Sequence, residues 1–338
     1  MNKKWSSLLK IGLSLIVLAV VLSQISLSEL GRELQGVDLE LFGLAVLFYL
    51  IGTGIRAYRW QMLFRALGEH ISYWRLIELY LVGMFFNHFL PTGMGGDVVK
   101  IYEVSRRESH TSVAISTTLT DRLTGILGSS LVALVAVLVD RRDVPGLLAQ
   151  AVFVVSFGIV AGALLLTRRR WLDAIIDRIG LFRRVISLPR VRRLYEALTG
   201  YTLSDILKTT LVSLPFTAML ILTQLCIARA LNVNLALKYF LLFVPLIALA
   251  NVLPISFNGL GVREGTYQLL FVPVGVSSAA AVAMSLAFHV VRLIVGLVGG
   301  AVYVFSNVRE QWPKRQAQPD AQPSVPPPSE EHKQQRTG

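Results

Sequence analysis

Long apolar stretches constrain this 338-residue chain more than any other feature of its sequence. Four of them, at 11–25, 41–55, 123–139 and 152–166, contain no charged residue. A helix needs about 20 predominantly apolar residues to cross the roughly 30 Å hydrocarbon core of a bilayer. Only 16% of the residues are charged, whereas a typical soluble domain has about 25%. The sequence therefore predicts an all-α polytopic membrane protein and argues against a soluble enzyme, a collagen-like rod or a disordered chain.

We expect about seven spanning helices in a transmembrane domain over residues 1–308. No A-x-A-like cleavage site follows the first apolar stretch, which favours a retained helix over a signal peptide. The long loop 168–208 is basic, and the Pro/Gln-rich tail 309–338 has the composition of a disordered segment. The clearest spanning stretches lie at about 11–25, 39–55, 122–139, 147–166, 209–228 and 278–305.

The net charge of +12 has two competing explanations, a nucleic-acid partner and membrane topology. On the expected topology, cytoplasmic segments collect 25 Lys and Arg and outer segments collect five. The count includes segment 56–79, which we expect at the membrane interface because aromatic and basic residues are interleaved in it. The bias follows the positive-inside rule. It predicts a multi-pass protein of the inner (plasma) membrane, with both termini cytoplasmic and no nucleic-acid partner.

Two short apolar segments stop at similar breaks. Each break has an Asn, then Leu-Pro, then small residues and glycines, and then an ionisable residue. By the charge count, the first enters the membrane from inside and the second from outside. We therefore expect two opposed re-entrant hairpins related as an inverted repeat, a pattern that marks the central site of many transporters. The first break carries Asn87, Pro91, Gly95, Gly96 and Asp97, and the second carries Asn251, Pro254, Asn258, Gly259, Gly261, Arg263 and Glu264.

The breaks have a chemistry that suits an anionic group. Pro91 and Pro254 end the short helices, and a helix that starts after each glycine cluster points its positive dipole end into the membrane. Two such ends can hold a phosphate. The alternative is that the breaks are structural kinks between packed helices. For Asp97, the alternative is a helix N-cap.

Further charges lie near or within the membrane, where ionisable groups are costly and usually paired or functional. Asp121 and Arg122 open an expected spanning helix, and Arg292 lies well inside the last one. We expect Glu264, or in second place Asp97, to be the partner of Arg292. These residues complete the predicted substrate-binding set, with structural ion pairing as the alternative for the embedded arginines.

Catalytic signatures are missing from the sequence. No G-x-x-x-x-G-K-[ST], H-E-x-x-H, C-x-x-C or G-x-S-x-G pattern occurs, and the single Cys226 excludes an internal disulfide. We therefore expect that the protein is not an enzyme and that it has no cofactor and no metal site. Two alternatives remain: an intramembrane transferase acting on a lipid-linked substrate, and a non-catalytic membrane subunit of a lipid or glycan pathway.

Several of these motifs occur together in a known order. They are Asn87–Asp97 with Lys100, Asp121-Arg122-Leu123-x-Gly125, Leu253–Gly265, and Arg292 before Gly299-Gly300. In this combination the chain resembles the lysylphosphatidylglycerol synthase transmembrane region family, also called flippase-like domain proteins, over residues 10–306.

The resemblance implies a function. In the best-understood members, this region moves an aminoacylated phospholipid between leaflets and a separate soluble domain synthesises it. Here a Pro/Gln-rich tail follows residue 305, so we expect a stand-alone member that lacks the aminoacyl-transferase domain. The prediction is a lipid flippase or transporter that binds an anionic head group in a central cavity. Its partner would be a phospholipid or polyprenyl-linked lipid, with a cytoplasmic enzyme as a further candidate. Without an NTPase motif, movement would be facilitated or coupled to a gradient, with Glu264 or Asp97 as candidate proton carriers.

Overall fold

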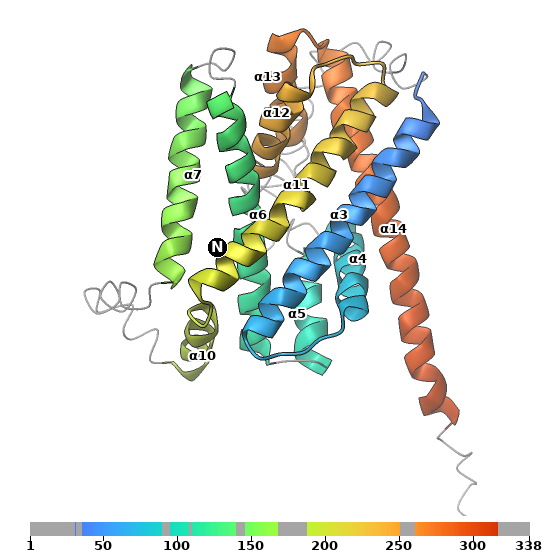
Figure 1. Ribbon diagram of the computed structural model, residues 1–338. Helices are drawn as coiled ribbons and strands as arrows, with labels where there is room; N and C mark the ends of the chain where they lie inside the picture. Colours follow the sequence, from blue (N-terminus) through green and yellow to red (C-terminus); the bar gives the residue numbers. More distant parts are fainter. Residues whose placement is uncertain are drawn as a thin grey trace, which may run out of the picture.

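The computed structural model describes residues 31, 36–89, 95–107, 110–139, 146–167, 188–250 and 261–316, and their regular structure is entirely helical (Figure 1). This confirms the all-α prediction. The helices are α3 (Leu39–Ala66), α4 (Tyr73–Phe89), α5 (Gly95–Arg107), α6 (Thr111–Val139), α7 (Gly146–Thr167), α10 (Pro189–Leu198), α11 (Leu203–Ala230), α12 (Leu237–Ala250), α13 (Val262–Phe271), the 3-10 turn η1 (Val272–Val274) and α14 (Ser278–Gln316).

Four of the described helices are long and apolar enough to cross a membrane: α3, α6, α11 and the part of α14 from Ser278 to Phe305. Shorter apolar helical segments occur at Val152–Ala163 in α7 and throughout α12. The chain is thus a multi-pass membrane protein. The expected first helix at 11–25 lies outside the described residues, and the total of about seven spans stays a prediction.

Helices α3 and α11 form an antiparallel pair through the length of the molecule (Figure 1). At one end, the backbone N–H of Asp38 donates to the carbonyl of Ala230 at 3.0 Å. Farther along, the Arg59 guanidinium donates to Ser213 Oγ at 2.8 Å. Helix α6 packs against both. The resulting three-helix frame carries the polar side chains of the site on its inner face.

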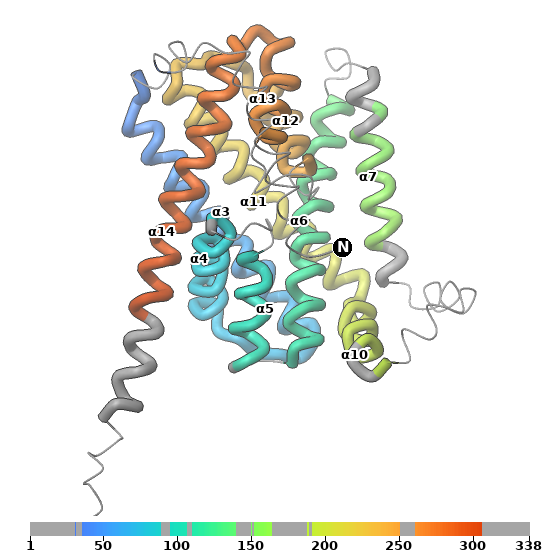
Figure 2. Tube along the Cα trace, turned by 180° about the vertical axis from the view of Figure 1, so that it is seen from behind, coloured from blue at the N-terminus to red at the C-terminus, as the bar shows by residue number. Residues whose placement is uncertain are grey.

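Two helical hairpins lie in opposite halves of the molecule (Figures 1 and 2). In the first, α4 and α5 are antiparallel, with the Lys100 Nζ 4.1 Å from the ring centroid of Tyr80. In the second, α12 packs on α13 through Phe243 and Phe271, whose ring centroids are 5.1 Å apart. The connecting residues 90–94 and 251–260 lie outside the described part of the chain. That the hairpins are re-entrant and form an inverted repeat stays a prediction.

Glycine lets other helices contact the α4 backbone directly. A Cβ atom on Gly96 of α5 would overlap the carbonyl of Gly83, and one on Gly299 of α14 would overlap the carbonyl of Leu81. Small residues permit such close approach between helices in membranes. Helix α4 is therefore held between α5 and α14.

The prediction that segment 56–79 lies at the interface is wrong for its first half. Helix α3 continues to Ala66, and the side chains of Arg59 and Trp60 are fully buried inside the bundle. The chain tolerates this because a carboxylate on α6 accepts from Arg59. In the same way, α6 begins at Thr111, so Asp121 lies within it and not at its start.

The segments predicted to be cytoplasmic gather at one end of the molecule. The connection between α3 and α4, helix α10 and the C-terminal end of α14 lie at the same end in Figures 1 and 2. The start of α3, the end of α11 and the 3-10 turn after α13 lie at the other. The fold thus groups the segments as the charge count grouped them.

Candidate functional site

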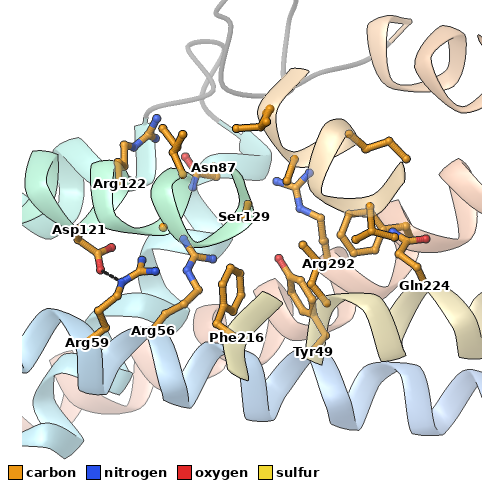
Figure 3. A pocket seen from close by; sticks show the side chains of 18 of the residues that line it. Tyr49, Arg56, Arg59, Asn87, Asp121, Arg122, Ser129, Phe216, Gln224 and Arg292 are labelled. Atoms are coloured by element: carbon orange, nitrogen blue, oxygen red, sulfur yellow. Dashed lines mark hydrogen bonds and ion pairs between the residues drawn. The ribbon is translucent and has the colours of Figure 1, made fainter. Parts of the chain in front are cut away.

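A cavity of about 290 Å³ lies where the two hairpins meet the frame of α3, α6 and α11 (Figure 3). Asn87 and Asp97, next to the tip of the first hairpin, line it, and so do Ile247, Ala248 and Leu249 at the end of α12. Its volume is at the lower end of the range of ligand pockets, about 300–1,000 Å³. A cavity of this size suits a head group better than a whole lipid.

The charge of the lining is strongly unbalanced. Among the described residues, the cavity has five cationic side chains and two carboxylates, which gives a formal charge of +3. The imbalance is unusual because unpaired charges in a membrane protein are costly. The cations are Arg56, Arg59, Lys100, Arg122 and Arg292, and the carboxylates are Asp97 and Asp121.

Asp121 forms the centre of a buried network between α3, α4, α6 and α11. The Arg59 Nε donates to its Oδ1 at 2.7 Å, and the Tyr80 hydroxyl donates to Oδ2. A second nitrogen of Arg59 reaches Ser213 on α11. Because both charges are compensated and hydrogen-bonded, this pair ties the helices together, and the removal of one partner would leave a buried charge.

Asp97 compensates two further cations. Lys100 Nζ lies 2.8 Å from Asp97 Oδ1, and the Arg122 guanidinium donates to Oδ2 across the α5–α6 contact. Asp97 is the third residue of α5, which begins at Gly95, so the N-cap alternative is wrong. Instead, Asn87 Oδ1 accepts from the Gly96 N–H at 2.7 Å. Both carboxylates of the cavity are thus already engaged.

Arg56 and Arg292 remain without a carboxylate or a hydrogen-bond acceptor among the described residues. The Arg56 guanidinium carbon lies 4.9 Å from the ring centroid of Tyr80 and 5.3 Å from that of Phe216. Each such contact contributes about 0.5–2 kcal/mol. Arg292 has no comparable aromatic contact in the described structure. Figure 3 shows both side chains at the cavity, where they are available to a ligand.

The expected partners of Arg292 are occupied elsewhere. Glu264 accepts from the Gly261 N–H at 2.6 Å and from Ser285 Oγ at 3.1 Å, so it closes the first turn of α13 and fixes that helix to α14. Asp97 pairs with Lys100 and with α6. The prediction of an Arg292–Glu264 or Arg292–Asp97 pair is therefore wrong, and Arg292 lines the cavity without a carboxylate partner among the described residues.

Arg263 lies behind the cavity wall and not in it. Its side chain is 2% exposed, and its Nη1 is 3.3 Å from His289 Nδ1 on α14. The His289 ring in turn contacts His88 of α4 edge to face, with centroids 5.3 Å apart. This contact joins the second hairpin to the first through α14.

The structure divides the predicted substrate-binding residues into three groups. The first lines the cavity, the second supports the hairpins, and the third lies outside the described residues; for all of them, a role in binding stays a prediction. The lining group is Asn87, Asp97, Asp121, Arg122 and Arg292; the supporting group is Gly95, Gly96, Gly261, Arg263 and Glu264; the group outside is Pro91, Asn251, Pro254, Asn258 and Gly259.

Several lining residues were missed by the sequence reasoning. Arg56 and Arg59 were assigned to the interface, although a helical pattern continues through them and their one-turn spacing places them on one face. Gln224 carried no signal, because a single amide in an apolar helix is usually structural. It is buried on the cavity wall, and its Oε1 accepts no hydrogen bond in the described structure.

Fold and cavity together define a polytopic α-helical membrane protein in which two hairpins enclose a cationic pocket. Comparison with known proteins specifies this class further. The family model described as lysylphosphatidylglycerol synthase TM region matches residues 7–300, and the chain belongs to that family. It is also 22% identical to a UPF0104 membrane protein of Pyrococcus horikoshii, over 87% of this chain and 96% of the relative. The resemblance drawn from the motifs is thus confirmed.

Proposed function

We propose that this protein is a lipid flippase or transporter that binds the anionic head group of a lipid in the cavity while the acyl chains stay in the bilayer. The observation that carries the proposal is the +3 charge of the cavity, in which Arg56 and Arg292 have no paired carboxylate among the described residues. The membership of the family supports a flippase-like role. The position of the cavity between the two hairpins suits a site that opens to either leaflet.

The cost of burying the two arginines exceeds what their described contacts return, which favours a cavity that binds an anionic ligand. Desolvation of an ion costs several kcal/mol. The two ring contacts of Arg56 contribute about 0.5–2 kcal/mol each and offset only part of that cost. For Arg292, no described group offsets it. Anionic groups in the cavity would supply the missing charge to these arginines and would form charge-assisted hydrogen bonds with them.

The remaining parts of the proposal concern chemistry, partners and orientation. We place the protein in the inner (plasma) membrane, with both termini on the cytoplasmic side. The gathering of the α3–α4 connection, α10 and the end of α14 at one end of the fold supports this orientation. The cargo would be a phospholipid or a polyprenyl-linked lipid. The protein itself would act as a transporter without a catalytic step, and a cytoplasmic enzyme would supply or consume the lipid.

A scrambling assay tests the proposal. The purified chain is reconstituted into vesicles that contain a fluorescent phosphatidylglycerol or phosphatidylcholine, and the accessible fraction is followed by chemical quenching. We expect the anionic lipid to move faster than the zwitterionic one. Arg56→Gln and Arg292→Gln should each slow it about tenfold or more, because each removes a charge-assisted contact.

The matched control is Arg65→Gln, which makes the same change on the same helix at an exposed position outside the cavity. It should leave the rate at the wild-type value. Unchanged rates in both cavity variants would refute the assignment of the site. The transport function would be refuted by vesicles in which the wild-type chain moves neither these two lipids nor a lipid whose head group carries two phosphates.

A further inference from the structure

The two uncompensated arginines of the cavity come from separate places in the fold. Arg56 lies on α3 and Arg292 on α14, and Figure 3 shows the Phe216 and Tyr49 side chains between them. The other three cations, Arg59, Lys100 and Arg122, pair with Asp97 and Asp121 and leave one positive charge in excess there. The cavity therefore offers two separate cationic positions and not one diffuse positive surface.

The fold holds Arg56 in place before any ligand binds. Its guanidinium carbon is 4.9 Å from the Tyr80 ring and 5.3 Å from the Phe216 ring. Tyr80 is itself fixed, because it donates to Asp121, and Lys100 lies over its ring. The N–H groups of a guanidinium lie in its plane. When its face is stacked on aromatic rings, these N–H groups stay available to a planar or tetrahedral anion. Pre-organisation of this kind raises affinity by lowering the entropic cost of binding.

The carboxylates restrict where an anion can bind. On the α5–α6 side of the cavity, Asp97 pairs with Lys100 and Arg122 and Asp121 pairs with Arg59, and both carboxylates would repel a further negative group. An anionic group is therefore directed to Arg56 and Arg292. A head group with one negative charge could compensate only one of them and would leave the other unpaired.

We infer that the cargo is a lipid whose head group carries two phosphate-type anionic groups, one bound by Arg56 and the other by Arg292. This inference rests on the proposed function and narrows its substrate class. Each group adds one charge-assisted contact, so loss of either should weaken binding by about ten- to a hundredfold. Zwitterionic and singly charged phospholipids bind weakly for the same reason, which prevents the abundant lipids of the membrane from occupying the site.

The test compares lipids that share the same dioctanoyl chains and differ only in the head group. The purified full-length chain in detergent is titrated with dioctanoyl phosphatidylcholine, phosphatidylglycerol, glycerol pyrophosphate and phosphatidylinositol 4-phosphate. The last two have two anionic groups, adjacent in one and separated by the ring in the other. We expect at least one of these two to bind tenfold or more tightly than phosphatidylglycerol. If neither does so, the inference is overturned.

Variants attribute the preference to the two arginines. Arg56→Gln and Arg292→Gln should each reduce the preference over phosphatidylglycerol to less than about threefold. Arg65→Gln, an exposed position on α3, should retain it in full. A preference that survives in both cavity variants would contradict the inference. Thermal unfolding of each variant shows that a lost preference does not come from a misfolded protein.

A soluble competitor separates a lipid from a free anion. Inorganic pyrophosphate should displace the bound lipid only at much higher concentration, because it lacks the acyl chains. Equal potency of pyrophosphate would show that the two anionic groups need not belong to a lipid, which would overturn the inference.

These experiments measure binding and not translocation, so the proposed transport function and the inferred head-group preference can fail separately. Selective binding with no scrambling refutes transport alone, whereas scrambling with no head-group preference refutes the present inference alone.

Discussion

Arg56 and Arg59 lie one turn apart on α3, yet they have different surroundings. Arg59 is buried with Asp121, Tyr80 and Ser213 as partners. Among the described residues, the Arg56 guanidinium contacts the rings of Tyr80 and Phe216 and pairs with no carboxylate. The same residue type therefore has a structural role at one position and a candidate binding role at the next. Stability and binding can be separated by mutating them individually.

We expect Arg59→Gln to destabilise the protein by about 3–5 kcal/mol, because it leaves the Asp121 carboxylate buried without its cation. Arg56→Gln removes a charge that has no carboxylate partner in the described structure, and it should change the stability by less than about 1 kcal/mol. Thermal unfolding of the purified proteins in detergent measures both. Equal losses in the two variants would contradict the division of roles.

A double variant provides the control for this prediction. Arg59→Gln combined with Asp121→Asn removes both charges, so part of the stability lost in Arg59→Gln should return. Residues in direct contact show such coupling, of about 0.5–3 kcal/mol. If the stability losses of the two single variants simply add in the double variant, the Arg59–Asp121 ion pair has no coupling energy of its own.

At this scale, sequence reasoning found the charges within or directly before apolar runs and missed Arg56, which directly follows one. Arg292 stands within a long apolar stretch, and Asp121 and Arg122 precede one, so they were included in the predicted site. Arg56 follows the apolar run 41–55 directly, and such a position suits an interfacial residue equally well. Only the packing of α3 against α6, which is distant in the sequence, decides that it faces the cavity.

Among the elements, α4 is one whose backbone two neighbouring helices contact directly. It packs against α3, α5 and α14, and two of these contacts bring backbones together at Gly96 and Gly299. The sequence predicted that a hairpin forms here from its Leu-Pro and glycine pattern. It did not predict the full length of α4 or the early start of α6 at Thr111, because polar residues in these helices pack against protein and lower the apolar signal.

We expect Gly299→Ala to lower the stability of the protein markedly, since the added methyl would overlap the carbonyl of Leu81 and force α14 away from α4. Overpacking of this kind costs about 1–3 kcal/mol. The measurement is the midpoint of thermal unfolding, together with the yield of monodisperse protein.

Gly158→Ala is the matched control, because it makes the same change in the interior of the apolar helix α7, where nothing lies within 4 Å of the added atom. This variant should unfold at the wild-type temperature. A similar loss in both would mean that glycine acts through helix propensity and not through the α4–α14 contact.

Over the whole molecule, the ends of the helices define two opposite faces. His70 is exposed on the connection between α3 and α4, and Ala236 is exposed between α11 and α12. These segments lie at opposite ends of the bundle in Figure 1. The charge count had assigned the first to the cytoplasm and the second to the outer side. The arrangement of the whole molecule therefore agrees with the charge count, although Arg56 and Arg59 had been assigned to the interface.

Cysteine labelling tests this orientation. In a Cys226→Ala background, which removes the single native thiol, we expect a membrane-impermeant maleimide to label Ala236→Cys in intact cells. His70→Cys should react only after the cells are broken. The Cys226→Ala chain without a new cysteine gives the background signal. The reverse pattern would invert the proposed topology, and labelling of both in intact cells would contradict a single orientation.

The cations of the cavity have a consequence for energetics because they belong to helices of the fold. When a head group moves, the positive charges of α3 and α14 stay with the protein, and only the negative charge of the cargo crosses the membrane. Such transport would be electrogenic. A potential of 100 mV contributes about 2.3 kcal/mol for each elementary charge that is moved across the membrane. With the cell interior negative, the membrane voltage itself would drive an anionic lipid outward, and more strongly the more charges its head group carries.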